Sequence, residues 1–107
     1  MTTIKTFKGD KLYDIEFTLK DANGVAVSLE NATLLFKAQK QGATSLKFSG
    51  SMTVISAAAG TCKYNVAETD FDEVGKYYAE IQVTYVGGKI ITFGDIIVIV
   101  QPELPRT

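Results

Sequence analysis

The segment GKYYAEIQVTYVGGKIITFGDIIVIV, Gly75–Val100, predicts two long β-strands joined by a tight turn. In its first half, one expected face is polar except for a tyrosine (Lys76, Tyr78, Glu80, Gln82 and Thr84), and the other is apolar (Tyr77, Ala79, Ile81, Val83 and Tyr85). A period of two is typical of a half-buried strand. The glycine pair at 87–88 predicts a two-residue hairpin turn, and Gly94-Asp95 predicts a bulge in the returning strand.

The returning strand ends in IIVIV, Ile96–Val100, which is apolar on both of its expected faces. Such a strand is either central in a sheet or covered by something else. If one face is not covered within the chain, it forms a contact surface for another subunit. We therefore expect Ile97 and Ile99 at an interface. Tyr78 and Tyr13 are further interface candidates, because exposed tyrosines favour protein interfaces or sugar stacking.

An alternative interpretation of the tyrosines is purely structural. In that interpretation Tyr77 and Tyr85 belong to the core, and Tyr78 covers one face of a sheet.

The rest of the chain predicts shorter strands. Residues 14–20 alternate in polarity, and Asn23-Gly24 predicts a hairpin turn with a short return strand at 25–27. Residues 32–39 have one apolar face and are interpreted as a strand, although their composition also suits a helix. Glycines punctuate residues 41–60, and an inward face follows at Cys62, Tyr64 and Val66. Residues 69–75 predict one helical turn, capped by Thr69 or Asp70 and closed by Gly75.

Seven to eight short strands, turn signals every eight to twelve residues and no convincing long helix predict an all-β chain folded as an antiparallel β-sandwich. At 107 residues the chain is expected to form one domain, residues 1–101, followed by a short tail at 102–107.

The overall composition excludes several classes of function. A net charge of −1 provides no broad basic surface for nucleic acid or for an anionic membrane. The N-terminal segment lacks the apolar core of a secretory signal, and no apolar run is long enough to span a bilayer. The single cysteine, Cys62, cannot form an intramolecular disulfide, which fits synthesis in a reducing cytoplasm.

Catalytic, cofactor-binding and metal-binding residues are not predicted. The chain has no histidine, which closes the common routes to an activated nucleophile and the common zinc sites. Asp70, Asp72 and Glu73 could ligate calcium, but a capped turn is the favoured interpretation. The DANG sequence, Asp21–Gly24, starts like a calcium loop but lacks a ligand at its fifth position and a glutamate at its twelfth. An enzyme is therefore not expected.

The order of these elements resembles a known family. FKGDKLYDIEFTLKDANGVAVSLENATLLFKAQ, residues 7–39, is similar to the start of the N-terminal domains of phage baseplate upper proteins and related tail-associated immunoglobulin-like modules. The shared pattern includes Gly9-Asp10, Gly24 and Phe36. The segment 75–100 resembles the family's ending, so the likeness covers residues 8–100.

The resemblance implies an immunoglobulin-like fold and a virion structural protein of a tailed phage or prophage, made in the bacterial host cytoplasm. Its expected partners are other tail or baseplate proteins and further copies of itself, with no nucleic acid and no membrane. Two other interpretations stay open. One is a carbohydrate-binding module for host recognition, which needs a cleft with at least two exposed tyrosines. The other is a calcium-stabilised adhesin repeat.

Overall fold

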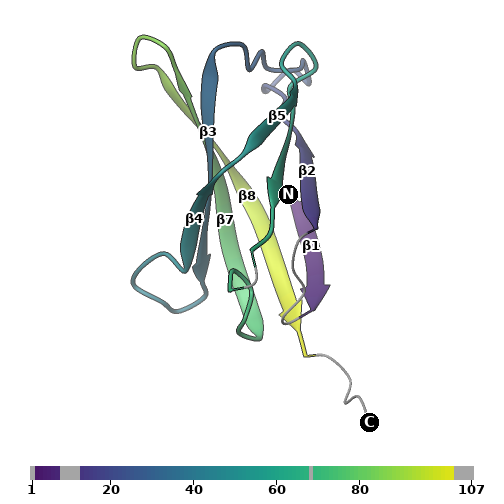
Figure 1. The fold of residues 1–107 in the computed structure, drawn as a ribbon, viewed down its shortest axis with the longest axis vertical. Coiled ribbons are helices and arrows are strands. Elements are labelled where there is room, and N and C mark those ends of the chain that lie inside the picture. The colour runs from purple at the N-terminus through teal and green to yellow at the C-terminus, as the bar shows by residue number, and fades with distance from the viewer. Residues whose placement is uncertain (1, 8–12, 68, 103–107) are drawn as a thin grey trace.

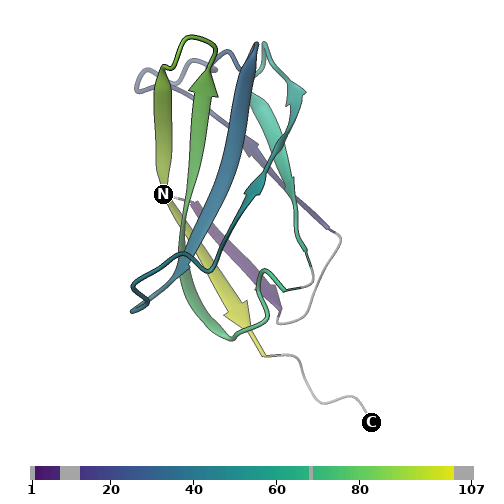
Figure 2. The same cartoon turned by 60° about the vertical axis from the view of Figure 1, so that its left-hand side comes forward.

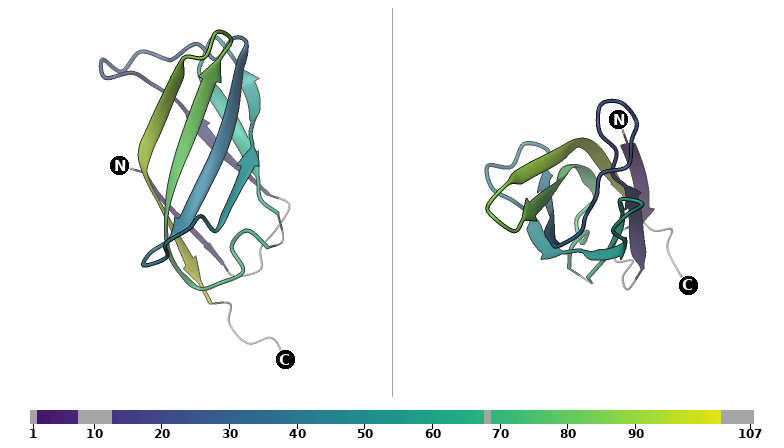
Figure 3. Two further views of the ribbon diagram at one scale, coloured as in Figure 1. Left: turned by 90° about the vertical axis from the view of Figure 1, so that its left-hand side faces the viewer. Right: turned by 90° about the horizontal axis from the view of Figure 1, so that it is seen from above.

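The computed structural model describes residues 2–7, 13–67 and 69–102, and these fold into two packed β-sheets (Figure 1). The first sheet has the order β1-β8-β7-β3-β4 and the second has the order β2-β6-β5. The strands are β1 (Thr2–Phe7), β2 (Asp14–Thr18), β3 (Ala32–Lys40), β4 (Phe48–Ser51), β5 (Thr53–Ser56), β6 (Thr61–Asn65), β7 (Gly75–Tyr85) and β8 (Ile90–Gln101). Figure 2 shows β8, β7 and β3 side by side, and the view from above in Figure 3 shows the two layers.

This strand order is the immunoglobulin arrangement. In that fold, strands C, F and G form one sheet, which variable-type domains extend by C′, while B, E and D pair in the other. Here β3, β7, β8 and β4 occupy the first set of positions, and β2, β6 and β5 occupy the second. The predicted all-β, immunoglobulin-like sandwich is therefore confirmed. One pair departs from the antiparallel pattern, because β1 lies parallel to β8.

The core between the sheets is built around aromatic rings. Phe36 of β3 is fully buried, with its ring centroid 4.9 Å from that of Tyr64 and 5.7 Å from that of Phe17 on the opposite sheet. Phe48 contacts Phe36 at a centroid distance of 6.0 Å, so the rings of both sheets form one cluster. Phe36 lies on the strand where antibody domains place their buried tryptophan.

A tyrosine near the start of β7 fixes the turn that leads into this strand. The hydroxyl of Tyr77, a fully buried residue, donates a hydrogen bond of 2.8 Å to the backbone carbonyl of Glu73. A tyrosine that bonds upstream backbone at this corner is a recurrent feature of immunoglobulin-like sandwiches. In antibody domains a disulfide cysteine follows two residues later; here Ala79 occupies that position, and the chain relies on packing alone.

The β7–β8 hairpin confirms most of its predicted features. Ala79 pairs with Ile96 and Ile81 pairs with Phe93, so two residues of β8, Gly94 and Asp95, oppose one of β7 and form the expected bulge. Both turn glycines have positive φ, 102° at Gly87 and 95° at Gly88. The turn is one residue longer than predicted, because the N–H of Tyr85 bonds the carbonyl of Lys89 across three residues.

The segment 41–60 consists of short strands, as its glycines indicate. β4 pairs with β3, and β5 pairs with β6, so the chain changes sheets between Ser51 and Thr53. Met52 marks this point, and its N–H still bonds the carbonyl of Leu34 in the first sheet. One extended segment therefore ties the two layers together.

Two sequence predictions are wrong in detail. The helical turn expected at 69–75 is a non-helical turn, because Asp70 closes a single β-turn onto Ala67 (3.1 Å) and Gly75, at φ 148°, begins β7. The return strand expected at 25–27 is reduced to one bridge between Lys20 and Ala26. The tail predicted at 102–107 is described only at Pro102.

Candidate protein-binding face

Three of the four predicted interface residues lie together on the outer face of the five-stranded sheet. Tyr78 of β7 pairs directly with Ile97 of β8, and Ile99 lies two residues further along the same strand. Ile96, Val98 and Val100 are buried, so Ile97 and Ile99 point to the opposite, outer side. The side chain of Tyr78 is 47% exposed, and both isoleucines are half-buried.

Lysines surround this apolar strip. Lys5 of β1 pairs with Ile99, and Lys76 of β7 pairs with Ile99 from the other side. The ammonium of Lys76 lies 5.4 Å from the ring centroid of Tyr78, a cation–π distance. Lys37 of β3 donates a hydrogen bond of 2.5 Å to Oε1 of Gln82. We name the surface formed by Tyr78, Ile97, Ile99 and these three lysines the docking face.

An open groove runs along one side of the docking face. It has a volume of about 310 Å³ and is lined by Lys37, Gln39, Leu46, Tyr78 and Glu80. Glu80 is the acidic residue of this region, pairing with Lys37 across β7 and β3. The groove contains one tyrosine, so it lacks the pair of aromatic platforms that the carbohydrate-binding interpretation requires.

Tyr13 lies away from the other three candidates. It precedes β2, packs against the core, and shares a hydrogen bond of 2.6 Å between its hydroxyl and Oγ1 of Thr6 in β1. Its backbone carbonyl accepts a bond from the N–H of Val66. This residue therefore joins β1 to the second sheet at the side of the sandwich.

The outer face of the three-stranded sheet is different in character. Asp14 of β2 forms an ion pair of 3.4 Å with Lys63 of β6 and accepts a hydrogen bond of 3.0 Å from Asn65. The Asn65 bond, with the neighbouring lysine, lowers the pKa of Asp14. Asp14 and Lys63 are thus paired with each other on this face, whereas the docking face combines apolar side chains with an excess of lysines.

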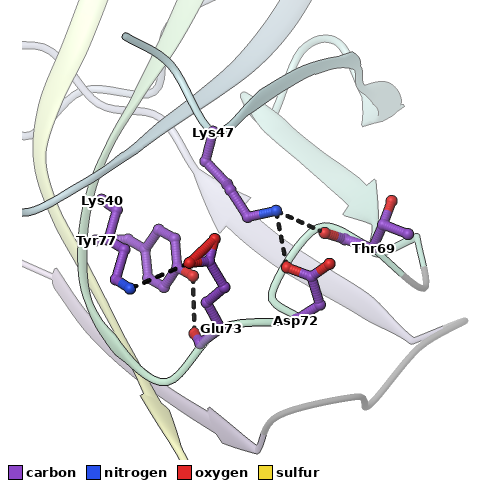
Figure 4. A network of polar contacts seen from close by, with 6 residues as sticks. All are labelled: Lys40, Lys47, Thr69, Asp72, Glu73 and Tyr77. Carbon is purple, nitrogen blue, oxygen red and sulfur yellow. Dashed lines mark hydrogen bonds and ion pairs between the residues drawn. The ribbon is translucent and has the colours of Figure 1, made fainter. Parts of the chain in front are cut away.

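The three carboxylates considered for calcium have separate partners. Lys47 lies 2.8 Å from Asp72 and donates to the backbone carbonyl of Thr69, while Lys40 pairs with Glu73 at 3.3 Å (Figure 4). The hydrogen bond to Asp72 raises the pKa of Lys47. Asp70 points into the core. Among the described residues, no group of three acidic, cysteine or histidine side chains is placed to hold a metal ion.

Cys62 is a core residue, as its sequence position predicts. Its side chain is fully buried, and burial raises the pKa of the thiol to about 11. A thiol that stays protonated at neutral pH is a poor nucleophile.

The sequence did not reveal β1 or its contribution to the docking face. Among residues 3–7 of this strand, Ile4 and Thr6 point inward, and Thr3, Lys5 and Phe7 are exposed. A six-residue strand with so few apolar residues has a weak alternation signal. Its position beside β8 could be inferred only from the unusual two-sided apolarity of Ile96–Val100.

The fold and this face define an immunoglobulin-like β-sandwich with an apolar strip, edged by lysines, on the outer side of its five-stranded sheet. The whole chain, residues 1–107, matches the family described as the BppU N-terminal domain, and the protein belongs to this family of phage baseplate upper protein N-terminal domains. The family identifies the chain as a structural domain of a phage virion. The resemblance inferred from the sequence is thus confirmed.

A solved structure supports the fold. The N-terminal domain of phage TP901-1 ORF48 superposes with a TM-score of 0.61 at 21% sequence identity, covering 92% of this chain and 84% of that one. Murine CRIg matches with a TM-score of 0.41 at 12% identity, covering 97% of this chain and 94% of that one. A search among curated proteins finds no match. No helix among the described residues is long and apolar enough to cross a membrane.

Proposed function

We propose that this domain is a non-enzymatic assembly module of a tailed phage or prophage baseplate, which binds another virion protein through the docking face. The observation that carries the proposal is the direct pairing of Tyr78 with Ile97, next to Ile99, on the outer side of the five-stranded sheet. The family supports a place in the baseplate, and the lone buried cysteine and the separately paired carboxylates give no support to an enzyme.

The chemistry of the docking face specifies the kind of partner. Large, partly exposed apolar side chains with an aromatic residue at the centre are typical of interface anchors. Lys5, Lys37 and Lys76 outnumber Glu80 around this centre. The expected partner surface therefore has an apolar centre and a rim that contains carboxylates, which would raise the association rate and orient the complex.

Self-association through the same face is a second outcome that the geometry allows. Two copies would bring their lysines together, since a two-fold interface places the same patch on both sides. This repulsion makes an acidic protein from the same virion the favoured partner over a second copy.

The test is complex formation with the purified tail and baseplate proteins that the same phage or prophage encodes, measured by light scattering after size-exclusion chromatography. We expect the native chain to form a defined complex with one of them. Ile97→Glu should weaken it at least about a hundredfold, since a buried unpaired charge is strongly unfavourable at an interface.

The matched control is Ile55→Glu, because Ile55 is 49% exposed on the three-stranded sheet. This variant should bind as the native chain does. Equal weakening by both variants, or no complex with any of these proteins, would contradict the proposal.

A further inference from the structure

One side of the sandwich is open beside the first half of β8. β1 pairs with β8 only from Ile96 to Gln101, so no described strand covers this edge from Ile90 to Asp95. In an antiparallel pair, hydrogen-bonded and non-hydrogen-bonded residue pairs alternate, and Tyr85 and Lys89 form a hydrogen-bonded pair. The backbone N–H and C=O groups of Ile91 and Phe93 therefore point towards β7. Ile90 and Thr92 therefore direct their N–H and C=O groups towards the open side.

The facing edge across this opening belongs to β2, one of the two edge strands of the other sheet. Between the two edges lies an opening of about 410 Å³ lined by Phe17, Thr18, Leu19, Lys20, Phe93, Gly94 and Ile96. Phe17 and Phe93 are half-buried there, while Leu19 and Ile96 are each 5% exposed. The outward-directed backbone groups of Ile90 and Thr92 thus lie on β8 just before the residues that form the apolar lining of this opening.

We propose that this opening binds an extended segment of another protein, which adds to β8 beside Ile90–Phe93 as a strand in line with β1. β1 already demonstrates the pairing: it lies parallel on the same edge of β8 and turns Ile4 and Thr6 inward. An added strand gains affinity from backbone hydrogen bonds and specificity from pockets for alternate side chains. This surface is separate from the docking face and does not depend on the function proposed for it.

The residues that line the opening determine which side chains the bound segment should carry. Its alternate side chains must be apolar to contact Phe17 and Phe93, and its nitrogens must be free to donate, which excludes proline. Among the described side chains that line the opening, Lys20 carries the only charge. A glutamate at one end of the segment would complement it, because opposite charges stabilise a strand pair.

The experiment uses a capped hexapeptide in which a glutamate is followed by alternating valine and threonine. Hydrogen exchange of the backbone amides is measured by NMR on the intact chain with increasing peptide. At a peptide concentration about ten times Kd, exchange at Ile90 and Thr92 should slow about tenfold, since protection follows the fraction bound. The amides of Ile91 and Phe93, already bonded to β7, should change far less.

Two controls keep the result specific. A peptide with proline at its centre should give no protection. Lys20→Glu changes an exposed side chain and should weaken the glutamate peptide while strengthening a lysine-led version of it. Unchanged exchange at Ile90 and Thr92 up to about 5 mM peptide, where even a millimolar Kd gives high occupancy, would overturn the proposal. Equal protection by the proline peptide would overturn it as well.

Discussion

The hydroxyl of Tyr64 donates a hydrogen bond of 2.5 Å to the carboxylate of Asp70, at the edge of the aromatic core. The same oxygen, Oδ2, accepts the N–H of Ala67 at 2.9 Å. Asp70 is 6% exposed and Tyr64 is also 6% exposed, so this contact fixes the turn after β6 against the core. Burial, followed by this bond to Asp70, raises the pKa of the Tyr64 phenol.

Removal of this donor should destabilise the fold. Tyr64→Phe keeps the ring but leaves a buried carboxylate with one partner fewer, so the free energy of unfolding should fall by about 1–3 kcal/mol. Urea denaturation measures the change. Tyr78→Phe removes an exposed hydroxyl and should stay within about 0.5 kcal/mol of the native chain. A Tyr64→Phe chain as stable as the Tyr78→Phe chain would contradict this role.

Gly60 should tolerate a methyl group less well than Gly87. Both have positive φ, 69° and 102°, where an L side chain is strained. A Cβ at Gly60 would also lie 2.7 Å from the carbonyl oxygen of Leu19 and 2.8 Å from that of Val27, whereas at Gly87 nothing lies within 4 Å. Gly87→Ala should cost about 1 kcal/mol and Gly60→Ala distinctly more, both measured by thermal unfolding. Equal costs would show that the close approach is unimportant.

The contribution of the Lys47 contacts to the order of the 69–74 turn should depend on salt concentration. Lys47 bonds both Asp72 and the carbonyl of Thr69, holding the 69–74 turn against the β3–β4 loop. Lys47→Met should lower stability by no more than about 1 kcal/mol, because the pair is partly exposed and screened. Hydrogen exchange in the turn should quicken in this variant, and the difference should shrink in high salt. Lys89→Met is the control, and an identical effect there would refute the assignment.

Stability should fall in alkaline solution. The thiol of Cys62 loses its proton at about pH 11 in the folded chain and near 9.0 when unperturbed. Above pH 9 the unfolded chain releases a proton that the native chain keeps, so unfolding becomes more favourable between pH 9 and 11. The phenols of Tyr64 and Tyr77, whose pKa values burial also raises, act in the same direction at higher pH.

Urea midpoints measured from pH 8 to 11 check this dependence. Cys62→Ala lowers the baseline by leaving a cavity but removes the thiol, so its stability should decline less steeply between pH 9 and 11. A slope identical to that of the native chain would contradict a protonated, buried thiol.

The sequence was most informative where one residue pattern determines both the strand and its neighbour. The alternation of 76–85 and the glycines at 87, 88 and 94 predicted the β7–β8 hairpin and its bulge, because period and turn chemistry are local properties. Tyr78 and Ile97 were each predicted as interface candidates, and the register of the structure pairs them on one face. The family resemblance rested on turn and core positions in residues 7–39, together with the segment 75–100.

Features that depend on distant partners were missed. β1 forms a parallel pair with a strand about 94 residues later in the chain, and its few apolar residues do not signal this by themselves. The turn at 69–75 has good helix-capping residues. The carboxylate of Asp70, however, accepts hydrogen bonds from Tyr64 and Ala67 instead of capping a helix. Tyr13 was expected with the interface residues, and only the tertiary fold places its hydroxyl on Thr6.

The most direct test of the account compares two reporters on opposite faces in the complex with the virion partner. Native Cys62 is buried, so Glu80→Cys on the docking side and Glu16→Cys on β2 each introduce one exposed thiol. Thiol-labelling rates are measured for each variant, free and bound. Docking through the five-stranded sheet predicts labelling at least about ten times slower for Glu80→Cys in the complex and unchanged labelling for Glu16→Cys. Protection of Glu16→Cys alone, or of neither thiol in a complex that has formed, would contradict the account.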